Sequence, residues 1–169
     1  NSDQGTLIIK KLVIRDNGGT AATSTFSFKV NNGSSVFFEA DGRNDITESV
    51  GLYSVVEDAT SSYAITYTNT ANQNADCNNL SVPNGDSVTC TVINNDIPPT
   101  ITIIKNTTSG DDTFTFTVVG PDPSTNTVLT MSTTTHNGTV RVGPADTEMH
   151  NLHLTARHYT VTEAAPPGW

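Results

Sequence analysis

The chain repeats itself, and this repeat limits the folds that are open to it. Three short segments recur in the same order: TLIIKK, TFSFKV and YSVVE at 6–11, 25–30 and 53–57 return as TITIIK, TFTFTV and YTVTE at 100–105, 113–118 and 159–163. Each copy is long enough to bury a core of its own. The repeat therefore predicts two tandem domains rather than a solenoid of short repeats.

Alternation of apolar and polar residues predicts β-strands in both copies. In the first strand Leu7, Ile9 and Lys11 share one face. The expected strands are 6–14, 23–31, 36–38, 52–57, 63–68 and 88–94 in the first copy, with a polar loop at 41–49 and another loop at 69–86, and 100–106, 112–119, 126–132, 138–143, 148–155 and 157–163 in the second. No stretch has a helical pattern of useful length. The sequence predicts an all-β chain of two antiparallel β-sandwiches.

The predicted boundary between the domains is a pair of prolines. We expect a first domain at 1–97, a linker at 98–99 and a second domain at 100–169. Consecutive prolines favour an extended, semi-rigid spacer. Little sequence follows Glu163, whereas further strands follow its counterpart Glu57, so the second domain is expected to lack its final strand or strands. An open sheet edge of this kind is a template for strand addition from the same polypeptide or from a neighbour.

Composition and charge exclude several classes of function. Acidic residues number 17 against 8 basic ones, which gives a net charge of −9 and argues against binding to nucleic acid or to an anionic membrane surface. Charged residues are only 15% of the chain, and abundant Thr, Ser and Asn are typical of extracellular β-proteins. No apolar run is long enough to cross a membrane. No signal peptide is visible, and the start of the sequence resembles a mature or trimmed end.

Cys77 and Cys90 are the only cysteines, and they flank a segment rich in Asn, Pro and Gly. A single pair in a chain of this composition predicts a disulfide formed in an oxidising compartment. The alternatives are two buried thiols and, less favoured, a metal-binding pair.

The ordered set of motifs resembles a known family. The motifs are a lysine in the first strand, Tyr-x-Val-x-Glu in a middle strand, and the segment CTVIN at 90–94 with an asparagine at its end. The final residues YTVTEAAPPGW at 159–169 complete the set. Together they resemble the collagen-binding-protein B-type, or prealbumin-like, domains of microbial surface proteins. The resemblance covers nearly the whole chain, and its weight comes from the occurrence of the set twice.

The resemblance implies an intramolecular isopeptide bond. In such domains the first-strand lysine is joined to the last-strand asparagine, with the glutamate as proton shuttle. In the first copy this assigns Lys11, Asn94 and Glu57, because all three fall on otherwise apolar faces while Lys10 points the other way. The alternative is that Lys11 extends its ammonium group to solvent at a sheet edge and that Glu57 makes an ordinary salt bridge. The second copy retains Lys105 and Glu163.

Other candidate sites have weaker support. Asn32, Asn79, Asn106 and Asn137 begin N-glycosylation sequons, although a chain rich in Asn and Thr contains such triplets by chance. His150, His153 and His158 lie close in sequence, but His150 and His153 would face opposite sides of a strand. Acidic turns at 41–45 and 111–112 lack the spacing of a calcium loop. We expect no metal and no cofactor.

The sequence thus predicts a non-enzymatic structural module of an extracellular surface protein, stalk or filament. Its expected partners are copies of itself in a linear polymer or neighbouring domains of a longer chain. The alternative is an adhesive tip module that binds carbohydrate or a host protein. A tip should display a cluster of exposed aromatic residues, and the single tryptophan, Trp169, lies within a family motif.

Overall fold

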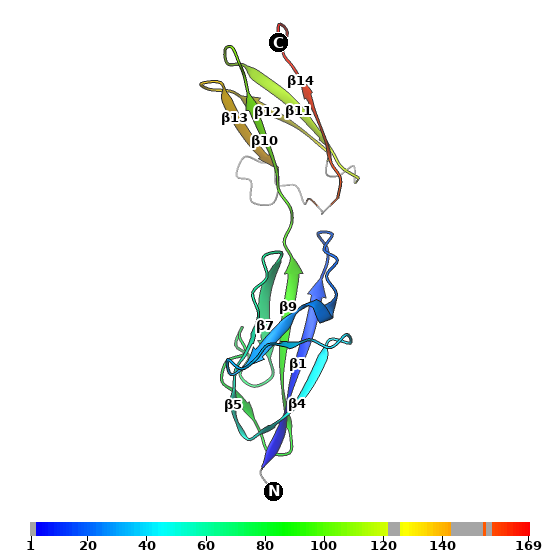
Figure 1. The fold of residues 1–169 in the computed structure, drawn as a ribbon, viewed down its shortest axis with the longest axis vertical. Coiled ribbons are helices and arrows are strands. Elements are labelled where there is room, and N and C mark those ends of the chain that lie inside the picture. Colours follow the sequence, from blue (N-terminus) through cyan, green and yellow to red (C-terminus); the bar gives the residue numbers. More distant parts are fainter. Residues whose placement is uncertain (1–2, 122–125, 143–153, 155–156) are drawn as a thin grey trace. The chain divides into compact units, whose positions relative to one another are not determined.

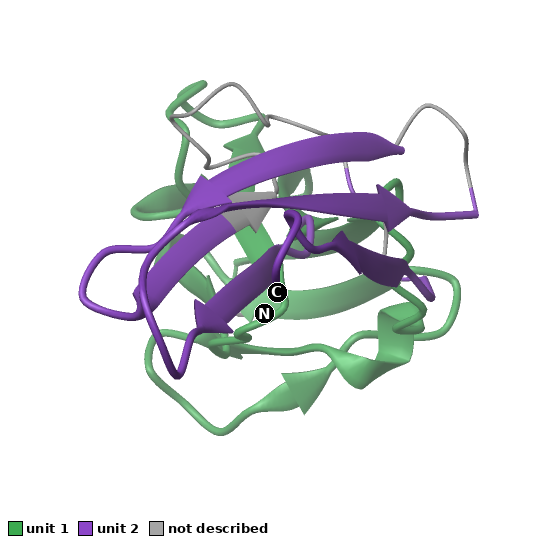
Figure 2. Ribbon diagram, turned by 90° about the horizontal axis from the view of Figure 1, so that it is seen from above, with its two compact units in different colours: residues 1–97 green, residues 98–169 purple. Residues whose placement is uncertain are grey.

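The computed structural model describes residues 3–121, 126–142, 154 and 157–169. The chain divides into two compact units, Asn1–Ile97 and Pro98–Trp169, which are coloured separately in Figure 2. Each unit has its own cluster of buried apolar side chains. The described residues form strands and one 3-10 turn at Thr23–Thr25, which confirms the all-β prediction. They contain no helix with the length and apolar character that a membrane crossing requires.

The described residues of unit 1 form nine strands in three sheets, and several of these strands are labelled in Figure 1. They are β1 (Gln4–Ile14), β2 (Ser27–Val30), β3 (Val36–Phe37), β4 (Arg43–Ser49), β5 (Gly51–Tyr53), β6 (Val55–Glu57), β7 (Tyr63–Asn69), β8 (Leu80–Val82) and β9 (Ser87–Asp96). The largest sheet has the order β4-β1-β9-β7, and the others are β3-β2-β6 and β5-β8. The central strand β1 pairs antiparallel with β4 but parallel with β9, a relation that alternation in the sequence does not reveal.

Three segments of unit 1 differ from the sequence prediction. Strand β4 lies in the segment 41–49 that was predicted as a polar loop, and its pairing with β1 stabilises it as a strand. Ile46 is its single apolar residue, so the sequence shows no alternation there from which a strand could be predicted. Strand β8 lies inside the predicted loop at 69–86. The predicted strand 52–57 is interrupted at Ser54, because β5 pairs with β8 whereas β6 pairs with β2.

The core of unit 1 is formed by the inward faces of its strands. Phe28, Phe38, Leu7 and Ile9 are almost completely buried. Cys77 and Cys90, the predicted pair, are joined by a disulfide and are buried in this cluster. The bond fastens the loop before β8 to the central part of β9.

Unit 2 repeats part of this plan with five described strands (Figure 1). They are β10 (Ile101–Asn106), β11 (Thr113–Val119), β12 (Thr127–Ser132), β13 (Asn137–Val142) and β14 (Thr160–Ala164). The sheets are β10-β13 and β12-β11-β14, and the core contains Phe114, Phe116 and Leu129. Most of the strand predicted at 148–155 lies outside the described residues.

The two units differ at the edge of their first strand. In unit 1, β1 has β4 on one side and β9 on the other. In unit 2, β10 has β13 on one side, and no described strand lies at the position that corresponds to β9. Within the described part of unit 2, one edge of β10 therefore has no pairing partner.

The disulfide gives the first prediction. Replacing Cys77 and Cys90 together by alanine should lower the free energy of unfolding of unit 1 by about 3 kcal/mol, because the unfolded chain is released from a closed loop of 13 residues. Chemical denaturation measures the change, and wild-type protein in reductant is the control. Equal stability of the oxidised and reduced proteins would contradict the expectation.

Candidate functional site

Three polar side chains meet inside the apolar core of unit 1. Lys11 comes from β1, Glu57 from β6 and Asn94 from β9. Their residues are 8%, 5% and 0% exposed. Each of the three lies on the inward face of its strand. Where β1 pairs with β9, Lys11 is opposite Val92 and Asn94 is opposite Val13.

The three side chains form a closed set of contacts. The Lys11 ammonium contacts one oxygen of the Glu57 carboxylate and lies 2.5 Å from the Asn94 side-chain carbonyl oxygen. The Asn94 amide nitrogen donates to the other Glu57 oxygen at 2.6 Å. The amine, the amide and the carboxylate are thus in direct mutual contact, with no side chain between them.

Aromatic rings enclose the lysine. Its Nζ lies 4.4 Å from the ring centre of Phe26 and 4.8 Å from that of Phe38, distances at which a ring face attracts a cation. The Tyr67 hydroxyl accepts the Glu57 backbone N–H at 3.1 Å. All three rings lie in strands predicted from the sequence, but alternation alone does not indicate that they surround a polar site.

Burial lowers the pKa of Lys11 below its usual value, and it outweighs the opposing effect of the hydrogen bond and charge of Glu57. A lower pKa makes the neutral amine more accessible, and the neutral amine is the nucleophilic form of lysine. A contact with an amide carbonyl and a neighbouring carboxylate is the arrangement that aminolysis of an amide requires.

Unit 2 contains a partial version of the same site. Lys105 of β10 lies 2.6 Å from the Glu163 carboxylate of β14, and its Nζ lies 4.3 Å from the centre of the Phe114 ring. These side chains are more open to solvent, at 21% for Lys105 and 32% for Glu163. Within the described part of the chain, the Lys105 ammonium makes its hydrogen bond to Glu163 and none to an asparagine side chain.

The four sequon asparagines are exposed: Asn32, Asn79, Asn106 and Asn137. His150 and His153 fall outside the described residues. The described residues contain no group of three or more His, Cys, Asp or Glu side chains arranged to hold a metal ion.

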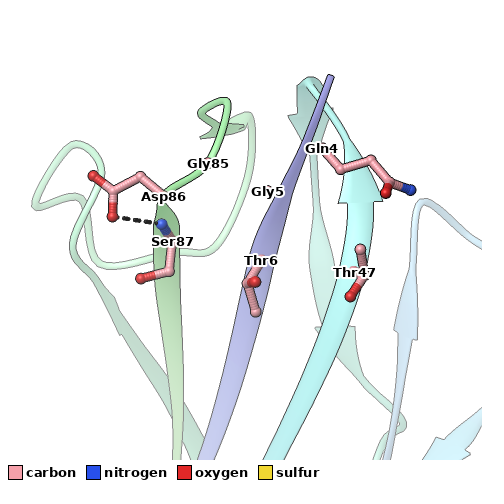
Figure 3. A pocket seen from close by; sticks show the side chains of 7 residues that line it. All are labelled: Gln4, Gly5, Thr6, Thr47, Gly85, Asp86 and Ser87. Carbon is pink, nitrogen blue, oxygen red and sulfur yellow. Dashed lines mark hydrogen bonds between the residues drawn. The ribbon is translucent and has the colours of Figure 1, made fainter. Parts of the chain in front are cut away.

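A shallow cavity lies away from the buried site, where β1 begins (Figure 3). It has a volume of about 330 Å³ and is lined by Gln4, Gly5, Thr6, Thr47, Gly85, Asp86 and Ser87. The labelled side chains are short hydroxyls, one amide and one carboxylate, and the Asp86 carboxylate accepts the Ser87 backbone N–H at 2.7 Å. This lining contains no pairing of a nucleophile with a base.

Comparison with known proteins supports the fold of the second unit. Residues 101–169 match the family model of a prealbumin-like fold domain, which confirms the resemblance to prealbumin-like domains of surface proteins for these residues. No curated protein matches the chain. Among solved structures, the TIE protein of Bacillus anthracis is similar at a TM-score of 0.49 and 17% identity. The similarity covers 83% of this chain and 26% of that chain, so the present chain spans about a quarter of its length.

The two lysine–glutamate pairs give the second prediction. Glu57→Gln should destabilise unit 1 by about 3–5 kcal/mol, because it leaves a buried amine without a counter-charge. Glu163→Gln should cost unit 2 less than about 1 kcal/mol, because water reaches that pair. Thermal or chemical unfolding of both variants provides the comparison. Similar losses of unfolding free energy in the two variants would contradict the conclusion that the Lys11–Glu57 pair is buried and that water reaches the Lys105–Glu163 pair.

Proposed function

We propose that this chain, whose second unit has a prealbumin-like fold, is a structural module of a microbial surface stalk or filament, cross-linked within unit 1 by a Lys11–Asn94 isopeptide bond. One observation carries the proposal: an amine, a carboxamide and a carboxylate are in mutual contact inside an apolar core. Isolating these groups from water is costly unless they are paired or joined.

The contacts define the steps of bond formation. Lys11 transfers a proton to Glu57, and its neutral nitrogen attacks the side-chain carbonyl carbon of Asn94. Glu57 then supplies that proton to the Asn94 amide nitrogen, which already donates a hydrogen bond to it, and takes a second proton from the attacking nitrogen as the new C–N bond forms. The C–NH₂ bond then breaks, and ammonia takes the remaining proton from Glu57 and leaves as ammonium. No oxidant or cofactor is consumed, and Glu57 ends in its original state.

The topology explains how such a bond serves a stalk. Strand β1 is the first strand of unit 1, β9 is the last, and the two run parallel side by side. Tension along the chain would shear this ladder. A bond between Lys11 and Asn94 carries the tension directly from β1 to β9. The part of the chain between these two residues then does not bear the tension.

The exposed lysine–glutamate pair and the open edge of β10 suggest how unit 2 joins a longer assembly. An extended segment lying beside β10, as β9 lies beside β1, would complete the sheet and cover Lys105. The segment could come from the same polypeptide in a linear array or from a neighbouring subunit by strand donation. A head-to-tail contact of the second kind generates a filament when it does not close into a ring.

The third prediction is that the protein has lost one molecule of ammonia on forming the Lys11–Asn94 bond. The intact mass of the native protein should be lower than the sum of its residues, after allowance for the disulfide, by one ammonia. Glu57→Ala should restore the full mass, because the proton relay is lost. Glu163→Ala is the matched control and should leave the deficit unchanged. A wild-type mass without the deficit would rule out the bond.

The fourth prediction concerns the edge of β10. If neighbouring subunits donate a strand, protection of β10 amides from hydrogen exchange should rise with protein concentration. The amides of β1, which are paired on both sides, serve as the internal control and should not change. Protection of β10 that is independent of concentration would argue against donation between subunits.

A further inference from the structure

The last residue of β9 is held by a loop that lies far from it in sequence. Asp96 is 4% exposed, and its carboxylate accepts the backbone N–H of Asn17 at 3.1 and 3.0 Å and that of Gly19 at 2.6 Å. The Asn17 side chain, which is itself buried, donates to the Asp96 backbone carbonyl at 2.8 Å. Both the side chain and the main chain of Asp96 are therefore fixed by residues that follow β1.

The two glycines of this loop allow it to make that contact. A Cβ atom at Gly19 would lie 2.6 Å from the Tyr63 hydroxyl and 2.8 Å from an Asp96 carboxylate oxygen, so a side chain at this position would push Asp96 away. Gly18 has φ +88°, a conformation that glycine adopts without strain. The turn Asn17-Gly18-Gly19 thus presents two backbone N–H groups to a single carboxylate.

Hydrogen bonds to Asp96 favour its ionised form. Burial raises the pKa of Asp96, but the hydrogen bonds from Gly19 and Asn17 outweigh burial and hold the pKa below its usual value. The titratable groups that face it are Asp16 in the loop and Tyr63 at the start of β7. The Arg15 guanidinium donates to the Ala21 carbonyl at 2.9 and 2.6 Å, and the Tyr63 hydroxyl accepts the Ala21 N–H at 3.2 Å.

We propose that Asp96 and the turn Asn17–Gly19 form a latch that fixes where unit 1 ends and the Pro98-Pro99 linker begins. This inference rests on the proposed structural function, because the latch has a role when tension passes along the chain. The Lys11–Asn94 bond lies upstream of Asn95, Asp96 and Ile97 and does not hold them. Without the latch, tension on the linker would peel these residues from β1 and β7, and each would lengthen the linker by up to about 3.6 Å.

The latch should open in acid. The pKa of Asp96 is lower in the folded state than in the unfolded chain, so its stabilisation is present above the ordinary aspartate pKa and is lost as the pH falls through the lowered one. The latch is therefore closed near neutral pH and opens only in the range below about pH 4.

Amide hydrogen exchange of the whole chain by NMR tests the latch through the amides of Asn17, Gly19 and Ile97. Asp96→Asn should reduce their protection more than about tenfold at pH 7, because neutral acceptors bind N–H groups less strongly than a carboxylate does. Gly19→Ala should have the same effect without changing any charge. Asp58→Asn is the matched control, because Asp58 is also a carboxylate of low pKa, about 2, but it is bonded to Ser27 and Lys29 instead.

The outcomes separate the latch from the cross-link. Wild-type protection at the three amides should fall on acidification to about pH 3, and Asp96→Asn should remove this dependence. Unchanged protection in both Asp96→Asn and Gly19→Ala would overturn the latch, as would equal loss throughout β1 and β9, which would indicate general destabilisation. The intact mass of the same samples reports the Lys11–Asn94 bond independently, so either inference can fail while the other stands.

Discussion

A lysine inside a β-sandwich must have its charge compensated, and unit 1 is arranged around this requirement. Lys11 lies on an inner strand of the largest sheet, so its ammonium group cannot reach water without disturbing the core. Compensation comes from both sides of the sandwich: Glu57 projects from the β3-β2-β6 sheet, and Asn94 projects from the strand beside Lys11. Strand order, the parallel pairing of β1 with β9 and the inward direction of all three side chains are needed together.

The two units show how environment decides what the same residue types can do. Lys11 and Lys105 each contact a glutamate and an aromatic ring. In unit 1 the pair is sealed from solvent and touches an amide, so the local dielectric is low and the amine loses basicity. In unit 2 water reaches the pair, which weakens the attraction between the two charges. Chemistry at the second lysine therefore requires a further element that covers it.

The end of unit 1 depends on a different kind of interaction. Backbone N–H groups of a glycine-containing turn replace water around the Asp96 carboxylate, and no cation is required. This contact and the Lys11 site both join the region of β1 to β9, one within the core and one at the border of the unit. Together they tie the first strand, the last strand and the linker of unit 1 into one connected structure.

The sequence alone determined the all-β class, the repeat and which side chains share a face in the strands that it predicted, because alternation reports side-chain direction directly. It also assigned Lys11, Glu57 and Asn94 to inward faces, and the family resemblance related them to one another. Only the tertiary structure decided that β1 and β9 run parallel, that β4 pairs with β1, and that Asp96 binds a distant turn. Strand order and direction depend on contacts between residues far apart in the chain, which leave no periodic pattern in the residues themselves.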